Sequence, residues 1–315
     1  MSSSSQKNVS LVVIVLSLLV AGGLLFAAIR ELSAEIERDG PTGSGEISEL
    51  HEASAQGDVA RMRSELDAGV AVDATTEGAE TWMRGMTPLM LAIFHKQPDS
   101  VSLLLERGAD PDATASDGRT PLIYAAGWGS ADTVRELLER DVTIDARARD
   151  GWTALMMASG SRGDPESVEL LIAKGANTSF RNKWGQTALH LSAVSRDERK
   201  IRALLAGGAD VSVRDNEGAT PLSILAANDA DAELLAELIE AAGDPRVVNA
   251  ADNDGITPLM RAADRGDADK VLVLLNAGAD TEPADVDGRT ALEWAETRDD
   301  ELGRRVAEIL RDARG

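Results

Sequence analysis

The tripeptide Thr-Pro-Leu returns at a nearly constant distance along this chain, and its spacing constrains the fold more than any other feature. In four copies the tripeptide is complete, and in three an alanine replaces the proline. The threonines are Thr87, Thr120, Thr153, Thr187, Thr220, Thr257 and Thr290. They are separated by 33, 33, 34, 33, 37 and 33 residues. A repeat of this length indicates a solenoid, in which one small unit is stacked on the next.

Each unit also carries apolar residues at helical spacing on both sides of a glycine. After Thr120 these are Leu122, Ala125 and Ala126, followed by Val134 and Leu137. Offsets of three and four place such side chains on one face of each of two short helices. Neither helix can bury that face alone, so neighbouring units must stack to cover it.

At these motifs the chain resembles the ankyrin repeat family from about residue 47 to residue 310. Seven copies carry Gly-x-Thr-(Pro/Ala)-Leu, and a degenerate eighth copy begins near Ser48 with Leu50 and His51. The resemblance implies an all-α solenoid of about eight helix-turn-helix repeats with projecting turns. It also implies that the concave side binds other proteins. His51 and His190 follow the leucine of the repeat, where the family's histidine supports the turn by hydrogen bonding.

Several units depart from the repeat. The first turn is expected to be lengthened over residues 75–84, and the 37-residue unit has extra residues near 243–247. Glu65 stands where leucine is expected, and Arg304 and Arg305 lie among apolar residues of the last unit. Polar residues of this kind are typical of terminal capping repeats.

An apolar segment precedes the repeats. Residues 11–29 carry no charge, and 19 residues at about 1.5 Å each span a bilayer core of about 30 Å. We predict a tail over 1–10, a transmembrane helix over 11–29, a juxtamembrane segment and Gly/Pro/Ser linker over 30–46, and the repeat domain over 47–315. A cleaved signal peptide is the alternative, but its apolar core is usually shorter.

Orientation follows less directly from the sequence. Lys7 lies on one side of the segment, and Arg30 and Arg38 lie on the other, so the positive-inside rule does not decide between them. By resemblance to amino-terminal signal anchors, we expect a bacterial inner-membrane protein with an extracytoplasmic repeat domain. A cytoplasmic repeat domain and secretion after cleavage are the alternatives.

Composition argues against several kinds of function. The net charge of −22 and the pI near 4.5 argue against nucleic acid, which needs a basic face. There is no cysteine, and the three histidines have no spacing typical of zinc ligands. Neither a nucleophile elbow nor a phosphate-binding loop is present. We therefore expect no enzyme, cofactor, metal or small-molecule substrate.

Residues at the groove-facing positions implied by the resemblance form the candidate binding site. They are Met83, Arg84, Met86, Phe94, His95, Arg119, Trp128, Arg147, Arg149, Trp152, Arg181, Lys183, Trp184 and Arg214. Aromatic residues are 3% of the chain, yet three of the five tryptophans fall in this set with six arginines. Tryptophan and arginine are enriched at binding hot spots. Alternatively, these tryptophans brace the turns and the arginines neutralise nearby aspartates.

Two classes of function follow. The first is a membrane-tethered, non-catalytic adaptor that binds an unidentified protein through the groove and turns of the central repeats. The second is a structural or protective envelope component that uses the solenoid as a spacer and has no dedicated partner.

A reporter enzyme fused after Gly315 tests the predicted orientation. We expect activity from a reporter that works only outside the cytoplasm, because the segment 11–29 is predicted to act as an uncleaved signal anchor. A cytoplasm-only reporter that is active at the same position would contradict this orientation.

Overall fold

Paired helices make up nearly all of the described chain. The structure is a computed structural model that describes residues 48–76 and 83–314, in which there are sixteen α-helices, one 3-10 helix and no strand. The first helices of the pairs are α3 (Glu49–Gln56), α5 (Pro88–Phe94), α7 (Pro121–Trp128), α9 (Ala154–Ser159), α11 (Ala188–Ser195), α13 (Pro221–Ala226), α15 (Pro258–Arg265) and α17 (Ala291–Glu296). The second helices are α4 (Val59–Asp67), α6 (Pro98–Glu106), α8 (Ala131–Leu138), α10 (Pro165–Ala173), α12 (Glu198–Ala206), α14 (Ala232–Ala242), α16 (Ala268–Asn276) and α18 (Glu301–Ala313).

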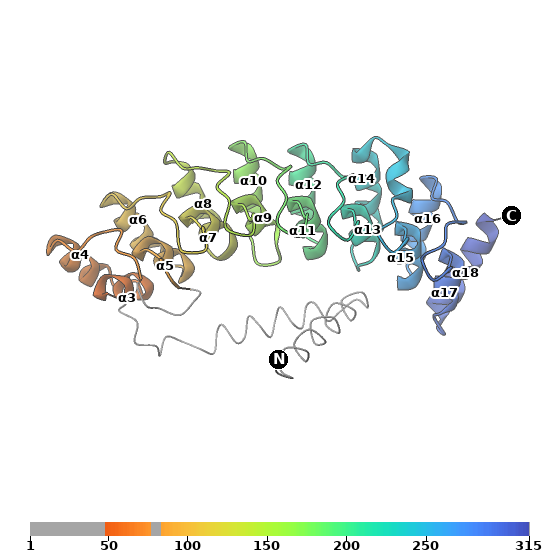
Figure 1. Cartoon of the computed structure of the whole chain (residues 1–315), viewed down its shortest axis with the longest axis horizontal. Coiled ribbons are helices and arrows are strands. Elements are labelled where there is room, and N and C mark those ends of the chain that lie inside the picture. Colours follow the sequence, from red (N-terminus) through yellow and green to blue (C-terminus); the bar gives the residue numbers. More distant parts are fainter. Residues whose placement is uncertain (1–47, 77–82, 315) are drawn as a thin grey trace, which may run out of the picture. The chain divides into compact units, whose positions relative to one another are not determined.

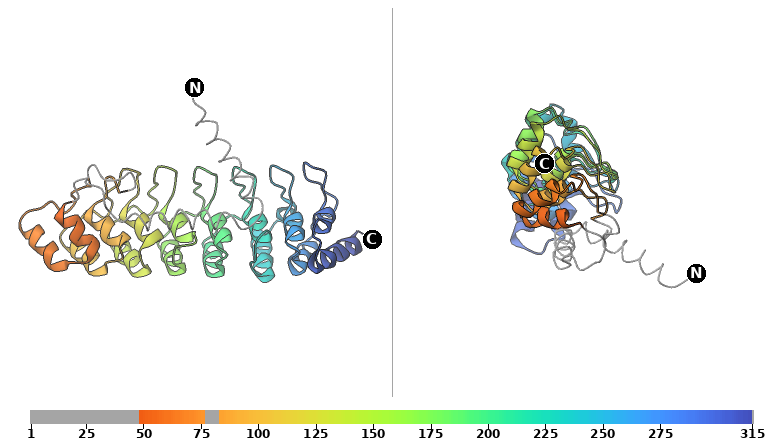
Figure 2. Two further views of the ribbon diagram at one scale, coloured as in Figure 1. Left: turned by 90° about the horizontal axis from the view of Figure 1, so that it is seen from below. Right: turned by 90° about the vertical axis from the view of Figure 1, so that its left-hand side faces the viewer.

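The pairs follow one another in chain order (Figure 1), and the loops between them project as a row on one side of the helices (Figure 2). These eight pairs confirm the predicted all-α repeat architecture. In the described residues no helix is long and apolar enough to cross a bilayer. The predicted segments 1–10, 11–29 and 30–46 lie outside those residues, and the transmembrane helix stays a prediction.

The repeated threonine directly precedes seven of the eight first helices, and in four of them proline is the first helical residue. The hydroxyl of Thr120 accepts a hydrogen bond from the amide of Ile123 at 3.4 Å, and Pro121 occupies the first helical turn. A capping threonine accepts a hydrogen bond from an amide that has no partner within the helix. Proline in the first helical turn costs no hydrogen bond, because an amide N–H at that position would have no acceptor within the helix. The sequence motif is therefore a helix start signal.

The repeated leucine shows how the repeats depend on stacking. The leucines from Leu89 to Leu259 at this position are at most 2% exposed, because a neighbouring pair covers them on each side. Leu292 of the last pair is half-buried, whereas Leu50 of the first pair is fully buried. Burying each such side chain contributes about 1.5–3 kcal/mol, and the adjacent repeat supplies part of that burial.

The projecting loops, which we call fingers and number by the repeat they follow, are also joined to one another. Their five-residue tips are 115–119, 148–152, 182–186, 215–219, 252–256 and 285–289 in fingers 2 to 7. The second tip residue donates its amide to a carbonyl of the preceding finger, as Arg149 does to Asp117 and Lys183 to Asp150, both at 2.8 Å. Six such bonds of 2.8–3.0 Å keep the fingers in register.

Ion pairs connect successive second helices on the surface away from the fingers. They are Arg107–Asp67, Arg135–Glu166, Arg199–Glu169 and Arg202–Glu237. All of these groups are partly exposed, so each pair contributes at most about 1 kcal/mol. These four pairs use four of the 54 acidic residues in contacts between repeats.

Two units depart from the regular repeat, one at the extra residues near 243–247 and one at the first finger. The 3-10 helix η1 (Pro245–Asn249) accommodates the extra residues near 243–247. In finger 1 the amide of Thr76 donates to the carbonyl of Met86 at 3.0 Å, and residues 77–82 between them are outside the described chain.

Two fully buried lysines were not predicted. Lys200 donates to the carbonyl of Gly160 at 2.6 Å, and Lys270 donates to the carbonyls of Leu225, at 3.0 Å, and Asn228. Both lysines reach back into the linker between the two helices of an earlier pair. The linkers 160–164 and 227–231 have five residues, whereas the linker between α7 and α8 has two. Each ammonium group therefore satisfies carbonyls that a longer linker leaves without helical partners.

Replacing Lys270 with methionine tests this role. The substitution keeps an unbranched buried side chain but leaves two carbonyls without a charged donor. We expect the free energy of unfolding in urea to fall by about 1–3 kcal/mol, the cost of unsatisfied buried polar groups. The matched control is Lys174→Met at an exposed site, which should change it by less than about 0.5 kcal/mol. Equal stability of Lys270→Met and the native chain would contradict the role.

The same variant has an expected pH dependence. Burial lowers the pKa of Lys270 below its usual 10.5, although Asp267 acts in the opposite direction. As the pH rises through the lowered pKa towards 10.5, the folded chain loses this proton before the unfolded chain does. The native protein should therefore gain stability in that window. Lys270→Met should lack this part of the gain.

Candidate functional site

Three arginines occupy the same place in consecutive fingers. Arg147, Arg181 and Arg214 directly precede the tips of fingers 3, 4 and 5. A Cβ added to the tip glycine of each finger would lie 2.9, 2.7 and 2.7 Å from the Nη2 of these arginines, respectively. Each guanidinium thus lies against the glycine of its own finger, and together the three form a row across the fingers.

The row is held in place by backbone carbonyls. Arg147 Nη2 donates to the carbonyl of Arg181 at 3.0 Å, and Arg181 Nη2 donates to the carbonyl of Arg214 at 2.6 Å. Arg149 Nη2 reaches in the other direction, to the carbonyl of Ser116 at 2.9 Å. These bonds join adjacent fingers, so the arginines brace them, whereas the alternative interpretation assigned bracing to the tryptophans and neutralisation of aspartates to the arginines.

Two tryptophans lie beside the row. The rings of Trp152 and Trp184 meet edge to face, with centroids 6.1 Å apart. Lys183 Nζ lies 4.5 Å from the Trp184 ring centroid and 2.9 Å from Asp150 Oδ2. Trp184 is 46% exposed, although tryptophan side chains are usually mostly buried in folded proteins. We call Arg147, Arg149, Trp152, Arg181, Lys183, Trp184 and Arg214 the central strip.

A second group of candidate residues lies on repeats 2 and 3. The Trp128 ring is 6.0 Å from Phe94 and 5.7 Å from Tyr124, and Arg119 lies 5.3 Å from Trp128. His95, whose ring centroid is 5.4 Å from that of Phe94, is exposed at the end of α5, and burial of part of the ring lowers its pKa. Arg119 pairs with Asp117 at 2.8 Å, so its charge is neutralised within its own finger.

Two candidate methionines are not at the surface. Met86 is fully buried and Met83 is 7% exposed, because Thr76 binds both residues and draws this part of finger 1 into the core. The prediction that they contact a partner is wrong for this conformation. Arg84 between them is exposed, and its carbonyl accepts the finger 2 amide of Ser116 at 3.0 Å.

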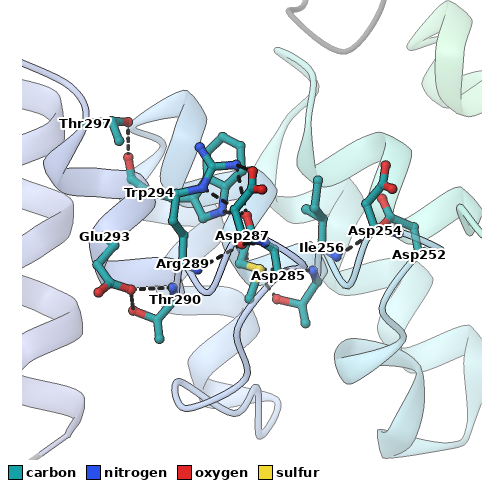
Figure 3. A network of polar contacts seen from close by, with 12 residues as sticks. Asp252, Asp254, Ile256, Asp285, Asp287, Arg289, Thr290, Glu293, Trp294 and Thr297 are labelled. Atoms are coloured by element: carbon teal, nitrogen blue, oxygen red, sulfur yellow. Dashed lines mark hydrogen bonds and ion pairs between the residues drawn. The ribbon is translucent and has the colours of Figure 1, made fainter. Parts of the chain in front are cut away.

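In fingers 6 and 7 the aspartate that closes the turn also pairs with an arginine, Asp252 with Arg261 and Asp285 with Arg289. Asp285 Oδ1 accepts the amides of Asp287 and Arg289 at 3.0 and 2.8 Å, and its Oδ2 accepts Trp294 Nε1 at 3.0 Å (Figure 3). Burial alone would raise the pKa of Asp285, but these hydrogen bonds and the Arg289 charge hold the pKa below its usual value. Asp252 binds two amides of finger 6 in the same way. Arg289 and Trp294 therefore bind the side chain that closes this turn, and Trp294 also packs against the core in the last pair.

The two histidines of the repeat motif support turns, as the resemblance implied. His51 Nε2 lies 2.9 Å from the carbonyl of Ala74, and His190 Nε2 lies 3.2 Å from that of Ala219. Burial lowers the pKa of both imidazoles, against the raising effect of these bonds. Within residues 48–76 and 83–314, no group of three metal-ligating side chains comes together.

Sequence reasoning missed two aromatic members of these groups. Tyr124 contacts Trp128, and Phe180 lies 5.1 Å beneath the Arg147 guanidinium. Phe180 directly precedes Arg181, so its position within the repeat could have identified it.

Comparison with known proteins places this geometry in a family. The model of ankyrin repeats in three copies matches residues 89–178, 155–247 and 223–312, which together cover more than half of the chain. The chain belongs to the ankyrin repeat family. A protein of Fowlpox virus (strain NVSL) that is named as an ankyrin repeat protein is 40% identical over 70 residues. That match covers 22% of this chain and 16% of the viral protein. Ankyrin repeats generally mediate protein–protein interaction, and the central strip lies on their fingers.

A double-mutant cycle on Trp152 and Trp184 tests whether the rings contact in solution. We expect the two alanine substitutions to be coupled by about 0.5–1.5 kcal/mol in urea unfolding, the usual value for an edge-to-face pair. Trp152 in finger 3 and Trp294 on α17, which have no ring contact with each other, are the control pair and should be additive within about 0.5 kcal/mol. Additive effects of Trp152 and Trp184 would contradict the contact.

Proposed function

We propose that this chain is a non-catalytic adaptor that binds a protein partner through the central strip of its ankyrin repeats. The observation that supports this proposal is the strip itself, in which arginines bonded to backbone carbonyls and an exposed tryptophan lie on neighbouring fingers of an acidic chain. Tryptophan and arginine are enriched at binding hot spots, and arginines that are already held in place lose less conformational freedom on binding. Phe94, His95, Arg119, Trp128 and the exposed Arg84 extend the proposed surface towards the first repeats.

We also propose that the adaptor is tethered to a membrane by residues 11–29, in the bacterial inner membrane with the repeats outside the cytoplasm. The proposed linker over 40–46 is short, since each residue adds at most about 3.6 Å. The partner would therefore be captured close to the lipid surface.

The structural alternative has one specific observation in its favour. The arginine-to-carbonyl bonds of fingers 3 to 5 stiffen the array, as a spacer without a dedicated partner would require. An adaptor would have a partner protein in contact with the central strip, whereas a spacer would have none.

Photo-crosslinking from position 184 in cells distinguishes them. A photoreactive phenylalanine analogue replaces Trp184, and the matched control places it at Leu272, an exposed apolar residue of α16 (46% and 41% exposed). We expect one saturable crosslinked species from position 184 that is absent from position 272. No species, or the same species from both positions, would contradict binding through the strip and favour the spacer.

A further inference from the structure

We propose that the central strip binds an acidic segment of the partner protein. Carboxylates of that segment pair with Arg147, Arg149 and Arg214, and an apolar side chain lies against Trp184. This inference rests on the proposed function and specifies the chemistry of its partner.

The first argument is uncompensated charge. In the described part of the chain, the ion pairs within 4.0 Å that involve fingers 2 to 5 join Arg119 to Asp117 and Lys183 to Asp150. The guanidinium groups of Arg147, Arg149, Arg181 and Arg214 have no described carboxylate at that distance. Outside the fingers, arginines such as Arg199 and Arg202 are paired with glutamates of the neighbouring repeat. A chain with 54 acidic and 32 basic residues thus leaves a row of cations unpaired.

The second argument is the number of donors that remain. A guanidinium has five N–H donors in a planar fork that matches a carboxylate. Arg147, Arg149 and Arg181 each use one nitrogen in a bond to a neighbouring finger, and Arg181 Nε also donates to the carbonyl of Gly185 in its own finger. Those bonds hold these three side chains still, so less conformational entropy is lost when a carboxylate binds.

The third argument is the period of the row. Arg147, Arg181 and Arg214 occur once per finger, and the equivalent residues of fingers 2, 6 and 7 are Thr114, Ala251 and Ala284. The row therefore stops at both ends. An extended segment that crosses fingers 3 to 5 would meet one guanidinium on each finger.

The flanking charges favour a short protein segment over a nucleic acid. Fingers 3 and 5 carry Asp150, Asp215 and Glu217, of which Asp150 pairs with Lys183 and Asp215 accepts two amides of its own turn. Asp117 and Asp254 lie on the fingers on either side of the row. A polyanion that extends past the row would also meet Asp117 and Asp254, which a segment confined to fingers 3 to 5 avoids. The net charge of −22 would repel both an acidic peptide and a nucleic acid at long range. At physiological salt this repulsion is screened beyond about 8 Å, so binding depends on the charges close to the strip.

Trp184 adds an apolar element to the recognition. Its ring is 46% exposed and is held from one side by the edge of Trp152. An apolar or aromatic side chain within the acidic segment would cover this ring, as is typical of the centre of an interface. A purely charged ligand would leave it exposed.

A selection from a random peptide library tests the inference. The full-length chain, held in a neutral detergent, is used to select dodecapeptides displayed on phage, and the enriched pool is sequenced. We expect enrichment of aspartate and glutamate around an apolar residue. Arg214→Gln, at the end of the row, should weaken the enriched peptides about tenfold, the effect of losing one charged contact of about 1.4 kcal/mol.

Controls separate this inference from the function on which it rests. Arg304→Gln removes the same charge from an exposed site on α18 and should change affinity less than twofold. Arg149→Gln is a second variant of the strip, and equal melting temperatures show that the variants are folded. An enriched pool without acidic bias that still requires Trp184 would overturn the inference and leave the proposed function standing. Equal binding of a 12-nucleotide single-stranded DNA would also overturn it, and no enriched pool would count against both.

Discussion

Every feature of this molecule depends on one constraint, which is that a pair of short amphipathic helices cannot cover its own apolar face. Leu89 and its equivalents become buried only when the next pair is stacked on them. Stacking therefore fixes the distance from one repeat to the next, and with it the distance between fingers. The amide-to-carbonyl bonds between fingers, such as Arg149 to Asp117, then form without strands because the helices have already brought the backbones together.

Because the fingers are held in register, residues at the same position of successive repeats lie side by side on the surface. Residues one repeat apart, such as Arg147 and Arg181, become neighbours in space, so a substitution repeated at one position builds a row. The acidic residues are distributed in another way. Glu166 and Glu237 connect second helices, and Asp252 and Asp285 close turns. Fingers 3 to 5 also carry carboxylates, but Asp150 pairs with Lys183 and Asp215 accepts two amides of its own turn, and within the described residues Arg147, Arg181 and Arg214 form no ion pair.

The repeat motif was sufficient to predict the helix pairs and their stacking, because these depend on spacing alone. It was not sufficient to predict the direction of individual side chains. Met86 has a groove position but is buried, since Thr76 binds it, and Arg147 bonds to a carbonyl rather than to the nearby Asp145. Lys200 was missed because its role depends on the length of a linker 40 residues earlier. Contacts of this kind depend on backbone geometry that a local pattern does not contain.

Because of the buried lysines, two of the helix pairs are completed by a side chain of the next pair, so a repeat of the sequence is not a complete structural unit. The linker 160–164 belongs to the fourth pair, yet it is completed by Lys200 of the fifth, and 227–231 is completed by Lys270 of the seventh. A chain shortened after α10 would keep every residue of the fourth pair and still lack the ammonium group that its linker requires. Truncation series and transplanted repeats therefore have to be cut one pair later than the sequence period suggests.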